Sequence, residues 1–108
     1  MMTVSTHVLD ISIGRPAAGV AVRLRRLDGD AWVDVFHGAT NGDGRVPSLV
    51  PDGVNADPGA YQLTFDVGAY FNARGLDSFY SVVAIDFVIR DAASHYHVPL
   101  LVSPFGYS

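Results

Sequence analysis

Short segments rich in β-branched and aromatic residues, separated by glycine- and proline-containing turns, run along the whole sequence. Residues 3–11 (TVSTHVLDI) and 31–38 (AWVDVFHG) are two examples, and the turns DGD and TNGDG each contain residues that tolerate positive φ. Turn signals recur at intervals of roughly ten residues, a spacing typical of a β-sandwich. The sequence therefore predicts an all-β fold with about seven strands in two sheets.

The expected strands follow from alternation and composition. They cover residues 3–11, 20–27, 31–38, 45–50, 60–67, 79–90 and 95–103, after which SPFGYS turns the chain into a last strand. Pro47 places the strand at 45–50 on a sheet edge. One short helix is expected near residues 69–74, followed by Gly75. Alternation predicts that seven side chains face inward or toward an interface: Val20, Val22, Leu63, Phe65, Val83, Ile85 and Phe87.

Composition limits the class of protein. The chain has 108 residues, of which 49% are hydrophobic and 17% charged, so it can bury a core, and residues 1–108 are expected to form a single domain. The net charge is −4, and Arg23, Arg25 and Arg26 form one short cluster, which argues against nucleic-acid binding. We find no signal peptide or apolar stretch of membrane-spanning length, so we expect a cytoplasmic protein without membrane contact.

Histidines are the residues with the clearest chemical potential. His95 and His97 are two positions apart on an expected strand, so they face the same side and could bind a metal if a third ligand were supplied. The alternative is a histidine at the rim of a sheet. His7 fits a half-buried histidine on a sheet face, and Arg45, directly after a glycine turn, fits a solvated arginine. Spacing alone cannot bring His7, Arg45 and His97 together.

Two long motifs carry a family resemblance. HVLDISIGRPAAGVAV at residues 7–22 and YHVPLLVSPFGYS at residues 96–108 resemble the N-terminal and C-terminal signatures of the transthyretin family, and NGDGRV and YQLTFDVGAYF lie at matching places between them. The resemblance implies a transthyretin-like (prealbumin-like) two-sheet sandwich with one short helix. It also implies a homotetramer, a dimer of dimers whose sites lie at the dimer–dimer interface.

The family has a hormone-carrier branch and a branch that hydrolyses 5-hydroxyisourate. Three channel positions separate them, with lysine, glutamate and threonine in the carrier and histidine, arginine and histidine in the hydrolases. Here these positions are His7, Arg45 and His97. The resemblance thus implies hydrolysis of 5-hydroxyisourate to 2-oxo-4-hydroxy-4-carboxy-5-ureidoimidazoline in urate degradation, with no metal or organic cofactor. The alternatives are a non-catalytic small-ligand binding protein and a purely structural sandwich that oligomerises.

The three residue types suit this hydrolysis. A histidine with its ordinary pKa near ~6.5 can transfer protons at neutral pH, so His7 and His97 form the expected proton-transfer pair. Arg45 stays charged and is expected to orient the substrate and stabilise developing negative charge. Its field should also keep a neighbouring histidine neutral. Which histidine is the base stays open.

The sequence departs from the hydrolase pattern at two places. Ser81 and Val82 stand where the hydrolases usually carry Pro-Glu, which we interpret as a change on a strand surface. The hydrolases also continue into a Tyr-Arg-Gly-Ser tail shortly after the residues corresponding to Tyr107 and Ser108. We expect this tail to be missing from the sequence rather than dispensable. A protein ending at Ser108 should keep the fold, assemble poorly and hydrolyse slowly.

Overall fold

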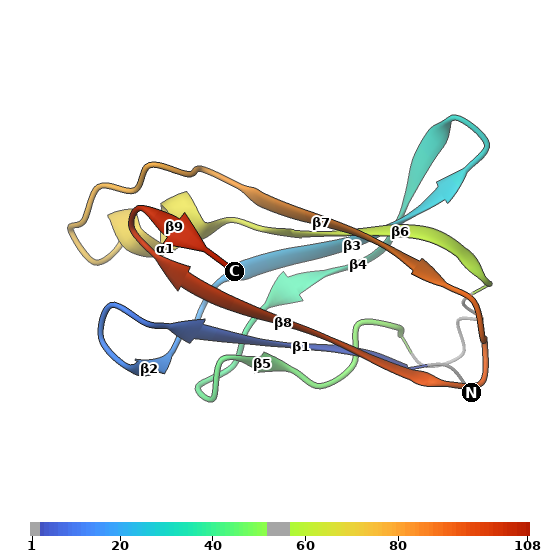
Figure 1. Ribbon diagram of the computed structural model, residues 1–108, viewed down its shortest axis with the longest axis horizontal. Coiled ribbons are helices and arrows are strands. Elements are labelled where there is room, and N and C mark those ends of the chain that lie inside the picture. The colour runs from blue at the N-terminus through green and yellow to red at the C-terminus, as the bar shows by residue number, and fades with distance from the viewer. Residues whose placement is uncertain (1–2, 52–56) are drawn as a thin grey trace.

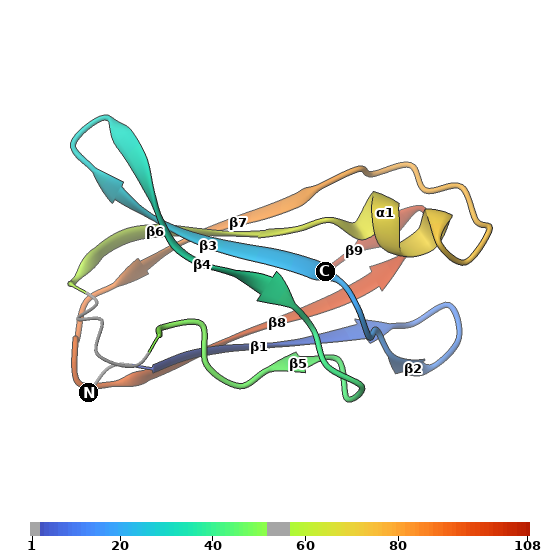
Figure 2. The same ribbon diagram turned by 180° about the vertical axis from the view of Figure 1, so that it is seen from behind.

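The computed structural model describes residues 3–51 and 57–108, and within them the chain forms two facing sheets and one short helix (Figures 1 and 2). The sheet that carries the N-terminal strand is called sheet A and the other sheet B. Sheet A contains β1 (Thr3–Asp10), β2 (Arg15–Pro16), β5 (Arg45–Val46), β8 (His95–Ser103) and β9 (Gly106–Tyr107). Sheet B contains β3 (Ala21–Asp28), β4 (Ala31–Ala39), β6 (Gly59–Phe65) and β7 (Val83–Ile89), and α1 (Val67–Asn72) follows β6.

The two sheets differ in strand direction. Sheet B is antiparallel throughout, in the order β4-β3-β6-β7. Sheet A has the order β2-β1-β8-β9, with β5 also paired to β1, and its central pair β1 and β8 is parallel. That pair runs in register from Thr3 beside His95 to Asp10 beside Val102. The chain thus brings its first and next-to-last strands together at the centre of sheet A.

Alternation along the strands builds the core between the sheets, as the sequence predicts. Val4 and Val8 of β1 and Leu100 and Val102 of β8 are almost completely buried. Of the seven side chains predicted to face inward, five are buried and Ile85 and Phe87 pack partly buried against the core. The buried members are Val20, Val22, Leu63, Phe65 and Val83. Residues at the other parity of β1 and β8 therefore face outward.

The predicted strand over residues 79–90 is too long, because β7 begins at Val83. Val83 pairs with Phe65, the last residue of β6, so the preceding residues have no strand beside them in the described part of the chain. The N–H of Gly68, in α1, donates instead to the carbonyl of Ser81 at 2.9 Å. The interpretation of Ser81 and Val82 as strand-surface positions is therefore wrong.

The helix begins two residues earlier than expected because of a side-chain cap. Asp66 accepts a hydrogen bond from the N–H of Ala69 at 3.1 Å, which satisfies a donor that a helix start leaves free. At the other end Gly75 has φ of 74°, and Leu76 N–H donates to the carbonyl of Phe71. Gly75 thus ends the helical segment as predicted, through a left-handed residue that side chains disfavour.

A buried carboxylate joins sheet A to α1. Asp10, at the end of β1, is fully buried. It accepts hydrogen bonds from the hydroxyl of Tyr70 at 2.8 Å and from the backbone N–H of Ser12 at 3.0 Å. Burial, followed by the hydrogen bond to Asp10, raises the pKa of Tyr70 to about 12, so the phenol remains a donor. This contact fixes the helix over the end of β1.

Candidate active site

His7, Arg45 and His97 lie on one face of sheet A, the face that points away from the core. Arg45 of β5 is directly beside His7 of β1, and residues paired across strands share a face. Ser5 of β1 is directly beside His97 of β8, and Ser5 and His7 are two positions apart. Val46, next to Arg45, is buried on the opposite side. Three separate strands therefore supply these three side chains to one surface.

A glycine turn fixes the position of Arg45. The side-chain oxygen of Asn41 accepts hydrogen bonds from the N–H groups of Asp43 at 2.9 Å and Arg45 at 3.0 Å. Gly44 has φ of 72°, and a Cβ there would meet the carbonyl oxygen of Val8 at 2.4 Å. Only glycine lets the turn approach β1 this closely. The predicted turn at residues 40–44 thus places β5, and with it Arg45, against β1.

The electrostatics of the cluster act on His97. His97 is exposed in the single chain, yet burial of part of its ring lowers its pKa, and the charges of Arg45, His95 and His7 lower it further. A pKa below the ordinary value keeps the ring neutral at neutral pH. The direction agrees with the effect expected of Arg45, and a neutral imidazole is the form that can accept a proton.

Three further residues of the same face contact His97 directly or through one another. The sequence assigns no role to Ser5 or Thr3, and it offers His95 only as a possible metal ligand. Ser5 Oγ lies 2.8 Å from His97 Nδ1 and 3.1 Å from His95 Nε2. The hydroxyl of Thr3 hydrogen-bonds His95 Nδ1. A spacing of two positions indicates that Thr3 and Ser5 share a face of their strand, as do His95 and His97. The parallel register of β1 and β8, which places the two pairs side by side, cannot be predicted from either segment alone.

The metal alternative for His95 and His97 finds no third ligand in the described residues. Within residues 3–51 and 57–108 there is no group of three His, Cys, Asp or Glu side chains placed to hold a metal ion. Both rings instead hydrogen-bond to the hydroxyl of Ser5. In the same part of the chain no helix is long and apolar enough to cross a membrane.

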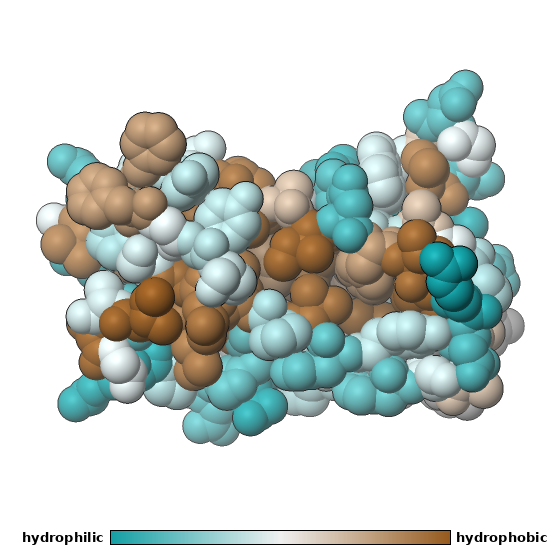
Figure 3. Space-filling model, in the orientation of Figure 1, coloured by the Kyte–Doolittle hydropathy of each residue, from teal (hydrophilic) through white to brown (hydrophobic). Residues whose placement is uncertain are grey.

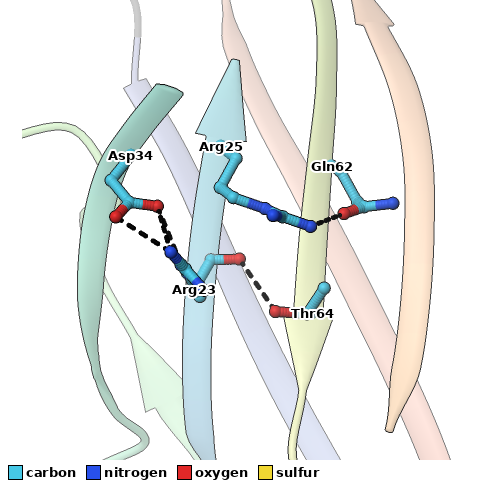
Figure 4. A network of polar contacts seen from close by, with 5 residues as sticks. All are labelled: Arg23, Arg25, Asp34, Gln62 and Thr64. Carbon is cyan, nitrogen blue, oxygen red and sulfur yellow. Dashed lines mark hydrogen bonds and ion pairs between the residues drawn. The ribbon is translucent and has the colours of Figure 1, made fainter. Parts of the chain in front are cut away.

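Sheet B carries a separate polar surface. A hollow of about 220 Å³ is lined by residues that include Arg23, His37, Thr64 and Asp66. Arg23 there already forms a two-bond ion pair with Asp34, at 2.8 and 2.9 Å (Figure 4). Exposed ion pairs of this kind contribute little to stability, and this one leaves the Arg23 guanidinium engaged within the sheet. The candidate active site is therefore the cluster on sheet A.

Comparison with known proteins decides the family. The sequence profile of the HIUase/Transthyretin family matches residues 4–108. The chain belongs to this family. It is 46% identical to 5-hydroxyisourate hydrolase 2 of Rhizobium meliloti over 108 aligned residues, which cover 96% of this chain and 90% of the relative. The resemblance carried by the two terminal motifs is thereby confirmed.

Solved structures confirm the transthyretin-like sandwich. The 5-hydroxyisourate hydrolase of Klebsiella pneumoniae is 40% identical with a TM-score of 0.86, covering 100% of this chain and 95% of its own. Sea bream transthyretin in complex with thyroxine is 29% identical with a TM-score of 0.91, covering 98% and 91%. Since both matches are this strong, the backbone alone does not separate a hydrolase from a carrier. Proteins that share a fold in this way differ in function through the side chains that the fold carries.

Proposed function

We propose that this protein is a hydroxyisourate hydrolase, a cyclic amide hydrolase that converts 5-hydroxyisourate to 2-oxo-4-hydroxy-4-carboxy-5-ureidoimidazoline. The observation that carries the proposal is the gathering of His7, Arg45 and His97 on one outward face from three strands. The names of its relatives, at 40–46% identity over nearly the whole chain, support the substrate.

The residues present supply the groups that this hydrolysis needs. A water molecule must lose a proton as it attacks the activated carbonyl, the carbonyl oxygen gains negative charge, and the leaving nitrogen must gain a proton. His97, whose pKa is lowered first by partial burial and then by the charge of Arg45, is suited to take the proton from water. Arg45 offers charged donors to the developing oxyanion, and His7, directly beside it, is the second proton-transfer group.

The test measures whether the protein accelerates the hydrolysis of 5-hydroxyisourate. 5-Hydroxyisourate is generated from urate with urate oxidase, and its decay is followed by ultraviolet absorbance with and without the purified protein. We expect decay well above the spontaneous rate, proportional to protein concentration. A non-catalytic small-ligand binding protein, the alternative, would protect or sequester at most one equivalent of ligand per site. Decay at the spontaneous rate with saturable binding would select that alternative.

We further propose that the active form is a homotetramer, a dimer of dimers. β7 is one edge strand of sheet B and β9 one edge strand of sheet A, and these two edges lie on one side of the sandwich (Figure 1). Figure 3 shows apolar residues on that side. Four aromatic side chains near β9 are among the exposed ones: Phe79, Tyr80, Phe105 and Tyr107. Open edges beside exposed apolar surface favour pairing with another copy of the chain.

We propose one domain over residues 1–108, of which residues 1–2 and 52–56 lie outside the described part, and a cytoplasmic location. Sheet A combines strands from both ends of the sequence, which supports one domain, because β1 pairs with β8 along the whole length of β1. Limited proteolysis and cell fractionation test these two points.

A further inference from the structure

We propose that Thr3, His95, Ser5 and His97 form a proton relay on the outer face of sheet A, in which Ser5 and His95 position His97 and carry its proton away. This inference rests on the proposed hydrolase function and assigns roles to residues outside the predicted set of His7, Arg45 and His97. The four residues are called the relay below.

The contacts form one continuous line across two strands. His97 Nδ1 lies 2.8 Å from Ser5 Oγ, and Ser5 Oγ lies 3.1 Å from His95 Nε2. His95 Nδ1 hydrogen-bonds the Thr3 hydroxyl. The register explains the line, because Ser5 is directly beside His97 and Thr3 directly beside His95. Ser5 is only 9% exposed, so water competes little for its hydroxyl.

The single proton of the Ser5 hydroxyl makes the relay directional. Ser5 can donate to only one histidine at a time and accepts from the other. In the first arrangement His97 Nδ1–H donates to Ser5 and Ser5 donates to His95 Nε2, which leaves His97 Nε2 with a free lone pair. In the second arrangement all these bonds reverse and His97 Nε2 carries a proton. The first arrangement makes His97 a base and the second makes it an acid.

Each proton that one group of the relay loses is gained by the next group. Water gives a proton to His97 Nε2 while its oxygen bonds to the substrate carbonyl. The Nδ1 proton of His97 then passes to Ser5 Oγ, and the former Ser5 proton passes to His95 Nε2. His95 becomes the imidazolium, and His97 is neutral with a proton on Nε2. Reversal of the same shifts delivers the Nε2 proton to the leaving nitrogen as the C–N bond breaks, and the first arrangement returns.

The charges around His97 explain why its proton should move on to His95. The charged groups that act on His97 are His7 on β1, Arg45 on β5 and His95 on its own strand, and together with burial they lower its pKa. An imidazolium at His97 is therefore disfavoured. His95 is exposed and lies across Ser5 from His97, one residue pair farther along the strands from His7 and Arg45. Moving the positive charge to His95 separates it from Arg45 while His97 keeps a donor for the leaving group.

The kinetic test compares Ser5→Ala with Ser5→Thr, which keeps a hydroxyl. We expect Ser5→Ala to lower kcat by at least ~10-fold with little change in KM, a part of the ~10²–10⁴-fold that a general acid–base group contributes. Ser5→Thr should recover most of kcat. The matched control is Ser103→Ala on β8, whose hydroxyl contacts the carbonyl of Gly106 outside the relay. His95→Gln, at an exposed position, should resemble Ser5→Ala if the proton moves to His95.

A second readout needs no substrate. The chain has four histidines, so ¹⁵N-histidine labelling with single substitutions assigns each ring, and the nitrogen shifts report its tautomer. We expect His97 to carry its proton on Nδ1 in the resting protein, and this preference to be lost in Ser5→Ala but kept in Ser103→Ala. A merely structural Ser5 would change the melting temperature and leave the tautomer and the pH profile of kcat unchanged.

The two proposals fail separately. If the wild-type protein does not hydrolyse 5-hydroxyisourate, the proposed function is wrong, while a tautomer change in Ser5→Ala still supports the positioning of His97 by Ser5. If the wild-type protein is active and Ser5→Ala matches it in kcat, pH profile and His97 tautomer, the relay is overturned.

Discussion

His97 is the residue at which burial, charge and hydrogen bonding meet. Its pKa lies below the ordinary histidine value, first because its ring is partly buried and then because Arg45, His95 and His7 oppose a further positive charge. A group with a lowered pKa loses its proton at lower pH than the free side chain. The base form of His97 therefore persists below the pH at which an ordinary histidine becomes charged, and activity should extend to the same lower pH.

Replacing Arg45 with glutamine tests the source of that shift. Arg45→Gln removes a positive charge close to His97, so the pKa of His97 should rise toward the ordinary value, and the acidic limb of the kcat/KM profile should move to higher pH. Titration of the His97 ring by NMR measures the pKa directly, even if the variant turns over slowly. An unchanged His97 pKa would show that Arg45 does not act on it.

At the scale of elements, the turn before β5 positions the site. In Gly44→Ala the new methyl group would meet the carbonyl of Val8 at 2.4 Å at a φ of +72°, so β5 should shift away from β1. Gly29 is the matched control, because it also has positive φ, at +61°, but nothing lies within 4 Å of its Cβ position. We expect Gly29→Ala to cost about 1 kcal/mol of stability and no activity.

Gly44→Ala should instead lose more stability than Gly29→Ala and at least ~10-fold in kcat/KM, since a small misplacement of a catalytic group carries such penalties. Thermal melting and substrate decay measure the two effects. Equal effects of the two substitutions on both quantities would mean that the close approach of Gly44 to β1 does not position Arg45.

The contact between α1 and β1 makes a stability prediction. Tyr70→Phe removes the hydroxyl that donates to the fully buried Asp10, which leaves the carboxylate with one partner fewer. Loss of a hydrogen bond to a buried charged group should reduce the free energy of unfolding by about 1–3 kcal/mol. Urea unfolding at fixed protein concentration measures it. Tyr80→Phe, at a 37% exposed tyrosine, is the control, and an equal loss there would contradict the account.

Elements with local signals could be predicted from the sequence. The residues DGD predict a hairpin, and Gly29 lies in the two-residue turn between Asp28 and Ala31 that joins β3 to β4. β8 has the predicted bounds because its alternation and its flanking turns agree. The start of β7 cannot be predicted from its own residues, because it depends on where β6 ends and where Asp66 caps α1. Strand length is a property of the pair rather than of one segment.

Only part of the candidate site, too, could be predicted from the sequence. His7, Arg45 and His97 were predicted through the family resemblance, and their spacing alone could not unite them. The parallel pairing of β1 with β8 joins residues about ninety positions apart, and no local pattern encodes such a register. For that reason the sequence predicts neither the contact of Ser5 with His97 nor that of Ser5 with His95.

At the scale of the whole molecule, the proposed assembly predicts at which edge of the sandwich a charged side chain prevents association. Phe105 is 75% exposed at the turn into β9, beside the open sheet edges, and Val33 is 41% exposed on β4, the opposite edge of sheet B. Phe105→Lys should shift the protein from tetramer to smaller species in light scattering after size exclusion, and Val33→Lys should not. A Phe105→Lys variant that assembles as the wild-type protein does would contradict this arrangement.

The central claim is that His7, Arg45 and His97 make one hydrolytic site, and the decay of 5-hydroxyisourate tests it most directly. The measurement compares the wild-type protein with His7→Ala, His97→Ala, the double variant and His37→Ala, a histidine on sheet B. Each single site variant should lose ~10²–10⁴-fold in rate, while the melting temperature stays close to wild type because both side chains face outward. His37→Ala should keep the wild-type rate. A double variant that remains fully active would contradict the account.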